Sequence, residues 1–360
     1  MEKFTNVKYC VIGAGHGGQA LAAYLRYMGN TTVLYNRTKT VIDQIKAYGG
    51  IELQGVINAM VKGLYATSNL KEAIDRSDVI MICIPAHAHQ DIAMKIAPFL
   101  KPRHKIVINP GRTLGAFMFA KYLKEAGMDL DLPIAETDTF ILTSRKTRPG
   151  VSQVFSRKNL VRVSGLTPEH TKVIHAYLSH TFPMMLPAES VLITSLSNIG
   201  MIFHPFAALM NIGRIECEET YLHYKEGITP SIANFLEKLD SERVQLAEYF
   251  GYQLHSARQW LEDVYGSKGS NLYDALQKTT QYDQITSPTD INTRYVFEDI
   301  PTGIVPVLEL AKLAGTPHKY LQLVLDLANE LYGIDFKEIG RWEVADFFET
   351  FKPKDKEVSI

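Results

Sequence analysis

The amino-acid sequence predicts an α/β N-terminal domain, with a doubly wound, mostly parallel sheet that has a mixed edge, joined to an all-α C-terminal domain. Up to about residue 110, short β-branched runs alternate with helical patterns, which is typical of βαβ units. From about Ser190 onward, helical patterns dominate. The chain has 360 residues, more than one compact domain usually holds, so we expect two domains.

The elements expected in the first half follow this alternation. The predicted strands are Lys8–Ile12, Thr31–Tyr35, Asp78–Ile84 and Lys105–Ile108, and the predicted helices are Gly17–Met28, Leu70–Asp75 and Gln90–Leu100. Three later runs, with a turn at Pro149-Gly150 among them, are expected to extend the sheet as its mixed edge: Leu132–Glu136, Gln153–Phe155 and Leu160–Ser164.

The second half is predicted to be helical throughout. The candidate helices are Val191–Cys217, Ser231–Phe250, His255–Val264, Ile304–Leu313 and His318–Tyr332. Pro183 and Pro187 bracket a short apolar segment before them, which places the expected domains at residues 1–187 and 188–360. The charged tail after Thr350 is expected to be mobile.

Composition excludes several classes of protein. The 38 basic and 39 acidic residues give a net charge of -1, which favours neither nucleic acid nor an anionic membrane as a partner. The three cysteines, Cys10, Cys83 and Cys217, show neither metal-ligand spacing nor a disulfide framework. We see no signal-peptide core and no run near the ~20 apolar residues of a membrane span. We therefore expect a cytoplasmic protein without a metal.

A glycine-rich turn follows the first predicted strand and opens the first predicted helix. Gly13 allows the tight turn, Gly15 lets the backbone approach a diphosphate, and Gly18 allows close helix–strand packing. The helix N-terminus then offers N–H groups and a favourable dipole to the phosphates. This context favours a dinucleotide-binding Rossmann domain over a merely flexible turn, and we count His16 with the cofactor-binding residues.

The end of the second predicted strand bears on cofactor choice. A site that prefers NAD usually has an acidic residue here to bind the adenosine ribose, whereas this chain has Asn36, Arg37 and Thr38. A guanidinium can pair with a 2′-phosphate that a carboxylate would repel. We therefore predict a preference for NADP(H), with NAD(H) left open. The alternative is that Arg37 is a solvated surface charge.

Two further loops should border the nicotinamide, because ligands bind at the carboxyl ends of parallel strands. Pro85 follows the third of the predicted strands listed above and Asn109 the fourth, and we assign both to the cofactor site. His87, His89 and Arg112 lie nearby. Loop polarity or a local Asn-Pro-Gly turn explains these loops equally well.

Candidate catalytic residues occur in the helical half. His204 lies in an apolar helical pattern, and Pro205 should kink that helix by freeing the Met201 carbonyl. Taken alone, His204 is more often a satisfied core histidine than a catalyst. Arg294 and Asp299 lie five residues apart before a predicted helix, where a local salt bridge is the ordinary explanation.

Taken together, these motifs resemble the opine dehydrogenase family, of the octopine/nopaline dehydrogenase type. The resemblance runs over nearly the whole chain, and its segments, in order, are Gly13–Ala20 (GAGHGGQA), Glu136–Thr139, Asn198–Pro205 with its His-Pro, Tyr224–Ser231 and Arg294–Pro301 (RYVFEDIP). The glycine loop is shared with many dehydrogenases, whereas the His-Pro pair with Arg-x4-Asp in a helical domain is far more specific.

The resemblance implies an NAD(P)H-dependent reductive condensation of an amino acid with a 2-oxo acid through an imine. The family's histidine, arginine and aspartate fall on His204, Arg294 and Asp299. The histidine would do the proton work, the aspartate would orient it, and the arginine would clamp the oxo-acid carboxylate. The pocket for the amino-acid side chain is expected on the helical domain, near Tyr224, Trp260, Tyr265 and Tyr273. The partners are then two small molecules, and a homodimer stays open.

Two other functions remain possible from the residues alone. One is a hydroxyacid or polyol-phosphate dehydrogenase of similar layout; many of these use a lysine on the long helix, but Val191–Cys217 contains none. The other is a non-catalytic NADPH-binding sensor, which would leave His204, Arg294 and Asp299 without a role.

Overall fold

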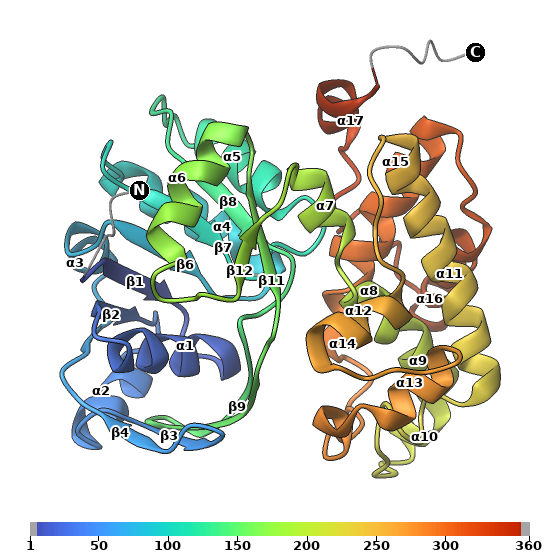
Figure 1. The fold of residues 1–360 in the computed structure, drawn as a ribbon, viewed down its shortest axis with the longest axis horizontal. Coiled ribbons are helices and arrows are strands. Elements are labelled where there is room, and N and C mark those ends of the chain that lie inside the picture. The colour runs from blue at the N-terminus through green and yellow to red at the C-terminus, as the bar shows by residue number, and fades with distance from the viewer. Residues whose placement is uncertain (1–5, 354–360) are drawn as a thin grey trace. The chain divides into compact units, whose positions relative to one another are not determined.

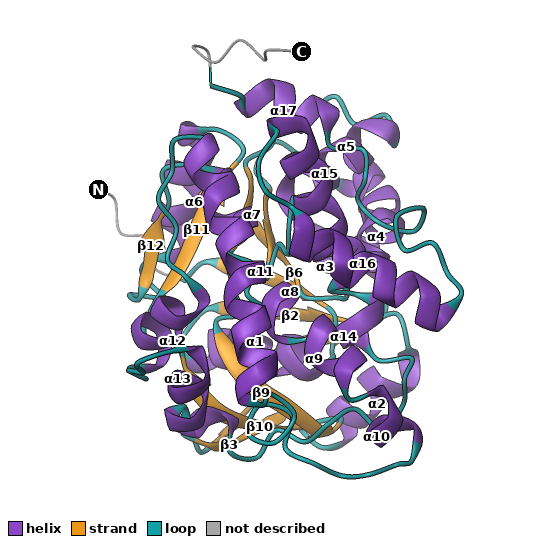
Figure 2. Cartoon of the chain, turned by 90° about the vertical axis from the view of Figure 1, so that its right-hand side faces the viewer, coloured by secondary structure: helices purple, strands orange, loops and turns teal. Residues whose placement is uncertain are grey.

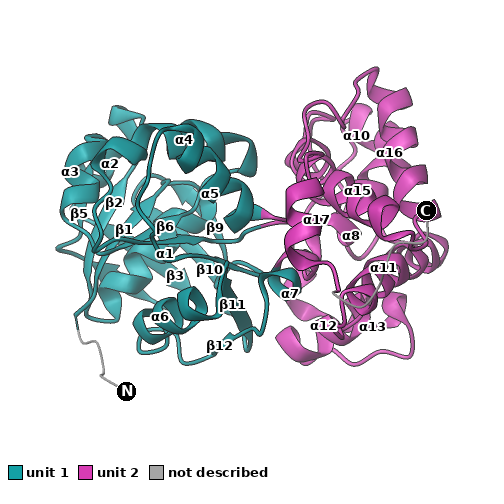
Figure 3. Ribbon diagram, turned by 90° about the horizontal axis from the view of Figure 1, so that it is seen from above, with its two compact units in different colours: residues 1–111, 115–194 teal, residues 112–114, 195–360 magenta. Residues whose placement is uncertain are grey.

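The structure is a computed structural model that describes residues 6–353, so the end of the charged tail, residues 354–360, lies outside the described residues. Two compact units make up the chain (Figure 3). Unit 1 comprises the residues up to Gly111 and Gly115–Thr194, and unit 2 comprises Arg112–Leu114 and Ser195 onward. The expected boundary at 187/188 thus stands shortly before the observed division at 194/195.

The main sheet of unit 1 has eight strands in the order β12-β11-β8-β7-β6-β1-β2-β5 (Figure 1). All neighbouring strands run parallel except β8 and β11, which are antiparallel. The strands are β1 (Lys8–Ile12), β2 (Thr31–Tyr35), β5 (Tyr65–Thr67), β6 (Val79–Ile82), β7 (Lys105–Ile108), β8 (Ile134–Thr137), β11 (Val161–Gly165) and β12 (Met185–Pro187). The predicted mostly parallel sheet with a mixed edge is confirmed. Because β1 pairs with β2 on one side and β6 on the other, the strand order reverses at β1, where ligands bind in such sheets.

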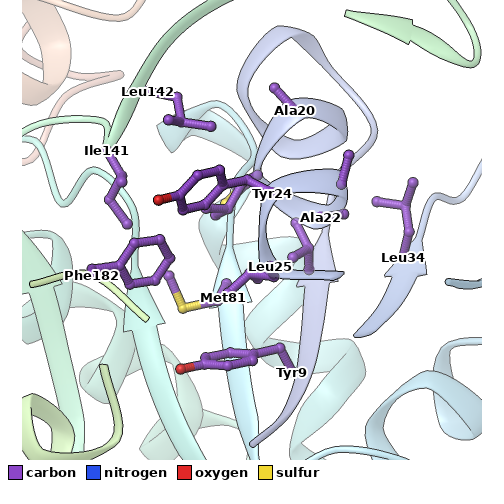
Figure 4. Close-up of a cluster of buried hydrophobic side chains, with 14 of the residues drawn as sticks. Tyr9, Ala20, Ala22, Tyr24, Leu25, Leu34, Met81, Ile141, Leu142 and Phe182 are labelled. Carbon is purple, nitrogen blue, oxygen red and sulfur yellow. The ribbon is translucent and has the colours of Figure 1, made fainter. Parts of the chain in front are cut away.

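Helices of unit 1 follow its strands and bury their apolar faces. They are α1 (His16–Tyr27), α2 (Lys39–Ala47), α3 (Leu70–Asp75), α4 (His89–Ile96), α5 (Gly115–Glu125) and α6 (Pro168–Leu178), with short 3-10 turns at Ala86–Ala88 and Ala97–Phe99. Helix α1 is alanine-rich and buried from Gly18 to Leu25, so it packs closely. In the core beside it, Tyr24 stacks on Phe182 with ring centroids 5.8 Å apart (Figure 4).

A second, four-stranded sheet in unit 1 was not expected. Its order is β4-β3-β10-β9, with β3 (Ile51–Gly55), β4 (Ala59–Val61), β9 (Leu142–Arg148) and β10 (Val151–Arg157). The prediction that Gln153–Phe155 extends the main sheet is therefore wrong, because β10 pairs with β3 and β9. The partner strands escaped prediction because they are half-exposed, and polar residues interrupt their apolar pattern.

Unit 2 consists of helices, and all named strands of the described residues lie in unit 1 (Figure 2). Its helices are α8 (Gly200–Phe203), α9 (Pro205–Met210), α10 (Ile212–Glu216), α11 (Pro230–Tyr249), α12 (Ala257–Tyr265), α13 (Leu272–Lys278), α14 (Arg294–Phe297), α15 (Val305–Ala314), α16 (Lys319–Tyr332) and α17 (Ala345–Phe351). A 3-10 turn, Thr280–Tyr282, and a π-helical turn, Ile300–Ile304, complete it. The predicted all-α C-terminal domain is confirmed.

The single helix predicted over Val191–Cys217 is broken into α7 (Val191–Leu196), α8, α9 and α10. One break falls at His204, as Pro205 predicts, since proline cannot donate to the preceding turn. By length and composition Val191–Met210 could cross a membrane, so the expectation that no run approaches that length is wrong. Because 89% of this window is buried inside the protein, it is a core segment and not a membrane span.

Three residues in the loop after β7, Arg112–Leu114, belong to unit 2, although the chain on both sides of them belongs to unit 1. The backbone N–H of Thr113 donates to the Thr302 carbonyl at 3.1 Å, and that of Leu114 donates to Ser195 Oγ at 3.1 Å. Arg112 and Leu114 both have positive φ, 59° and 62°. The loop after β7 therefore delivers a short, strained segment into the helical unit.

Candidate active site

The glycine loop of unit 1 needs its glycines for two different reasons. Gly13 has φ +110°, and a Cβ there would lie 2.5 Å from the Cys83 carbonyl oxygen; a Cβ on Gly18 would collide with the Gly13 carbonyl oxygen. A Cβ on Gly15, by contrast, would meet nothing within 4 Å, and Gly15 is exposed. Gly13 and Gly18 thus allow the turn to form, whereas Gly15 leaves room for a ligand at the N-terminus of α1. These residues fit a dinucleotide diphosphate.

Strand β9 packs on the N-terminus of α1 and adds a cation that sequence reasoning missed. The Lys146 backbone N–H donates to His16 Nδ1 at 2.9 Å, and Lys146 Nζ donates to the Ala14 carbonyl at 3.3 Å. Ser144 Oγ donates to the His16 carbonyl at 3.0 Å. His16 is thereby held in place, and an ammonium lies at the glycine loop. No sequence pattern links residues 16 and 146, because the contact exists only once β9 has folded back onto α1.

The residues that follow β2, Asn36–Thr38, include no carboxylate. Asn36 Oδ1 accepts from the Ala14 backbone N–H at 3.2 Å, and its Nδ2 donates to the Thr38 carbonyl at 3.4 Å. Asn36 therefore ties the end of β2 to the glycine loop. Arg37 is exposed, and Thr38 is the N-cap residue of α2.

The two loops assigned to the nicotinamide differ in character. Pro85 is exposed and precedes the 3-10 turn Ala86–Ala88. Asn109 is buried: its Oδ1 accepts from Thr137 Oγ1 at 2.8 Å and its Nδ2 lies 3.7 Å from Cys83 Sγ. The Asn109 side chain therefore joins neighbouring strand ends.

In unit 2, the break between α8 and α9 places His204 against two partners. Its Nδ1 lies 2.7 Å from Asp299 Oδ2 and its Nε2 lies 2.8 Å from the Tyr224 hydroxyl. Asp299, 95 residues further along the chain, is fully buried, and His204 is 8% exposed. With Nδ1–H donating to the carboxylate, Nε2 is the acceptor for the Tyr224 hydroxyl. The structure thus brings together two of the three predicted catalytic residues and adds Tyr224.

Aromatic rings enclose the imidazole. Tyr295 stacks on His204 with centroids 4.1 Å apart and an interplanar angle of 11°. His223 lies 6.1 Å from His204 and 4.9 Å from Tyr224, in edge-on contacts. These contacts restrict the ring to one orientation, so its two nitrogens are presented to fixed partners.

Burial and charge set the protonation of this pair. Burial lowers the pKa of His204, although Asp299 opposes the effect. Burial alone would raise the pKa of Asp299, but the charge of Arg112 and the hydrogen bond from His204 hold it below its ordinary value. Burial also raises the pKa of Tyr224 well above 10, with further contributions from Tyr295 and Tyr265. The resting state is therefore a neutral imidazole between an ionised carboxylate and a neutral phenol.

The shorter arginine–carboxylate contacts in this site involve Arg112 and not Arg294. Arg112 Nη1 lies 3.0 Å from Asp299 Oδ1, and its Nη2 lies 2.9 Å from Glu298 Oε2. Its side chain is 11% exposed. A Cβ on Gly200 would lie 2.6 Å from Arg112 Nη1 and 2.8 Å from Asp299 Oδ1. Glycine at this position therefore leaves the space in which the guanidinium and the carboxylate meet.

Arg294 occupies a different environment. Its side chain is 61% exposed, with Nη1 3.8 Å from Glu298 Oε2, and its guanidinium lies 5.7 Å from the Tyr295 ring centroid. The structure places it beside the His204–Asp299 pair but leaves most of its fork open to a ligand.

Three of the four aromatic residues expected around the substrate belong to one buried cluster. Tyr224 stacks on Tyr282 with centroids 3.9 Å apart, Tyr265 packs edge-on against Tyr282, and Trp260 packs edge-on against Tyr265. Tyr224 is therefore both a partner of His204 and one end of this cluster. Its place could have been guessed from the Tyr224–Ser231 motif, but no pattern in the sequence predicts a contact with His204.

Comparison with known proteins agrees with this arrangement. The α-helical domain of NAD/NADP octopine/nopaline dehydrogenases matches residues 187–332, and the N-terminal domain of NAD-dependent glycerol-3-phosphate dehydrogenases matches residues 8–112. An opine dehydrogenase of Arthrobacter sp. (strain 1C) is 34% identical over 334 residues, which cover 92% of this chain and 93% of the relative.

Among solved structures, octopine dehydrogenase with NADH and pyruvate is similar in fold, with a TM-score of 0.72, 20% identity and coverage of 98% of this chain and 100% of the other. Yersinopine dehydrogenase with bound NADP+ has a TM-score of 0.71 and 17% identity, and 93% of each chain is covered.

Fold and similarity together define an NAD(P)-dependent oxidoreductase. The chain belongs to the opine dehydrogenase family, because its similarity to the Arthrobacter enzyme extends through both units.

Proposed function

We propose that the protein catalyses NAD(P)H-dependent reductive condensation of an amino acid with a 2-oxo acid such as pyruvate, giving an N-(carboxyalkyl)amino acid. The observation that carries this proposal is the buried His204 held between Asp299 and Tyr224. Pyruvate is present with NADH in the octopine dehydrogenase structure of similar fold. A buried, oriented imidazole is suited to moving protons at a reacting carbonyl.

The chemistry assigns His204 a proton-transfer role in two steps. The amine attacks the oxo carbon, and the proton that its nitrogen loses goes to the oxo oxygen. Loss of water then requires a second proton on this hydroxyl; His204 in its protonated form donates it from Nε2, returns to its neutral form and leaves an iminium ion. A dinucleotide held at the glycine loop of unit 1 would supply the hydride that reduces the carbon of this iminium ion, which gives a secondary amine. Asp299 holds the imidazole in one orientation and stabilises its protonated form, as the acid does in a catalytic triad.

For the substrate carboxylate we assign the binding group to Arg294. Arg112 is already paired with two buried carboxylates, whereas Arg294 keeps most of its side chain exposed and only a 3.8 Å contact to Glu298. A guanidinium that is not saturated by protein partners can form a two-point fork with a carboxylate. That geometry would fix the oxo acid near His204.

For the cofactor we propose a preference for NADP(H). The end of β2 carries no carboxylate to repel a 2′-phosphate, Asn36 is held by the glycine loop, and Arg37 is exposed. We further assign Lys146 Nζ, at the Ala14 carbonyl, to the diphosphate. The exposed Arg37 would discriminate between the two dinucleotides, whereas Lys146 would contact the diphosphate of both.

The test is a panel of amino acids and 2-oxo acids assayed with NADPH and with NADH. We expect cofactor oxidation that requires both an amine and an oxo acid, with a secondary amine as product by mass spectrometry. Oxidation with the oxo acid alone would indicate a hydroxyacid dehydrogenase. Tight NADPH binding without turnover on any pair would indicate a sensor. Either result overturns the proposal.

A further inference from the structure

We propose that Arg112 is a positioning residue for the His204–Asp299 pair, one that sets the pH range in which His204 can donate a proton. This inference rests on the proposed function, because it assumes that His204 does the proton work. Arg112 comes from the loop after β7 and lies far from the pair in sequence. Its other acidic partner, Glu298, is 186 residues further along the chain.

Contacts with other segments of unit 2 anchor the residue after Arg112, Thr113. Thr113 donates its N–H to the Thr302 carbonyl, and its own carbonyl accepts from Arg341. Asn198 Nδ2 donates to Thr113 Oγ1 at 3.4 Å. Arg112 itself holds φ +59°, a conformation that costs a non-glycine residue free energy. Such anchoring maintains a strained backbone that aims one side chain.

The guanidinium and the imidazole bind opposite oxygens of the same carboxylate. Arg112 Nη1 forms an ion pair with Asp299 Oδ1 at 3.0 Å, and His204 Nδ1 is hydrogen-bonded to Asp299 Oδ2 at 2.7 Å. These two contacts fix the orientation of the Asp299 carboxylate and keep it ionised. Because Arg112 draws on the negative charge that would otherwise stabilise a protonated His204, it opposes protonation of the ring.

The charged and titratable groups around the ring come from several elements. They are Asp299 and Glu298 before the π-helical turn, Arg294 and Tyr295 on α14, His223 and Tyr224 in the segment before α11, and Arg112. Arg112 and Glu298 act on the ring through Asp299 and through their charges. Replacing either should therefore shift the titration of His204 without removing its hydrogen-bond partners Asp299 and Tyr224.

The experiment compares the pH dependence of kcat/KM for the 2-oxo acid in wild type and Arg112→Gln. In the reductive direction His204 must be protonated, so the rate falls as the pH rises through its pKa. Loss of Arg112 removes a positive charge, raises that pKa and should move the falling limb about 1 pH unit higher. Titration of His204 by NMR of histidine-labelled protein, assigned against His204→Gln, should move in the same direction without any need for turnover.

Matched variants separate the possible outcomes. Arg162→Gln removes an arginine near buried Asp138 in unit 1 and should leave the limb in place. Glu298→Gln frees Arg112 to act on Asp299 alone and should move the limb lower; it serves as the test if Arg112→Gln does not fold. A His204-dependent limb that is unmoved in the folded variant overturns this inference, whereas a limb that His204→Gln does not abolish counts against the proposed function itself.

Discussion

The two units present their sites by opposite means. Unit 1 forms its site largely from backbone. Its glycines are needed because they have no side chain: Gly18 lets α1 approach the end of β1, and Gly15 leaves open space. Unit 2 forms its site from buried charged and aromatic side chains that segments distant in sequence bring together, such as His204 and Asp299. A site formed by backbone binds the diphosphate, which many dinucleotides share. A side-chain site determines which reaction takes place, so specificity for chemistry should reside in unit 2.

The largest effect should come from His204→Gln. Glutamine keeps a polar side chain of similar reach but cannot exchange a proton near neutral pH, so kcat should fall by about 100-fold or more. Binding of NADPH, followed by its fluorescence, should stay unchanged, because the glycine loop belongs to unit 1. A kcat within a few-fold of wild type would remove His204 from the chemistry.

Arg294→Ala should separate binding from chemistry within unit 2. Loss of a charged two-point contact typically costs about 1.5–3 kcal/mol, so KM for the 2-oxo acid should rise about 10- to 100-fold. We expect KM for the amino acid and kcat to change far less in steady-state assays. A rise confined to the amino-acid KM would assign Arg294 to the other substrate.

In unit 1, Gly15→Ala and Gly18→Ala form a matched pair. A methyl group on Gly15 enters open space, so the melting temperature should stay close to wild type while the dissociation constant for either dinucleotide rises about 10-fold. A methyl group on Gly18 collides with the Gly13 carbonyl oxygen, so the melting temperature itself should fall, by an overpacking cost of about 1–3 kcal/mol. Equal loss of stability in both variants would contradict the distinction.

Arg37→Asp tests whether unit 1 discriminates between cofactors at all. A carboxylate at this exposed position would repel a 2′-phosphate, so NADPH affinity should fall about 10-fold and NADH affinity should change little. Lys146→Gln is the comparison, because an ammonium at the shared diphosphate should matter equally for both cofactors. If Arg37→Asp weakens both to the same degree, the preference lies elsewhere.

The smallest effect concerns stability at acid pH. Burial lowers the pKa of His223 to about 3, from about 6.5 in an unfolded chain. Between these values the unfolded chain binds a proton that the folded one does not, so the free energy of unfolding falls as the pH drops below about 6.5, by up to ~1.4 kcal/mol per pH unit for this residue. Urea unfolding of wild type and His223→Gln at several pH values should give a shallower slope for the variant.

How far the sequence predicted the molecule depends on whether a feature is local. The glycine loop and the parallel strands beside it are contiguous patterns, and they were predicted with nearly correct bounds. Strands β3, β4 and β9 were missed because their half-exposed faces carry no apolar run. His204 and Asp299 could be paired only through the family resemblance, since each has an ordinary explanation alone.

The Arg112 contacts lay beyond sequence reasoning for a related reason. An Asn-Pro-Gly turn explains the loop before it locally, and nothing in the pattern of residues 109–114 indicates two acidic partners near residue 299. Only the folded helical unit, with Gly200 leaving space for the guanidinium, produces those contacts.

The three residues Arg112–Leu114 also limit how this protein can be divided. Because they are part of the helical unit while their neighbours are not, the gene cannot be cut once to yield two self-sufficient pieces. A fragment starting at residue 188 would lack Arg112 and, with it, one ion pair to each of the buried acids Glu298 and Asp299. Grafting this helical unit onto another dinucleotide-binding domain would therefore require the recipient's own loop at that position to be rewritten as well.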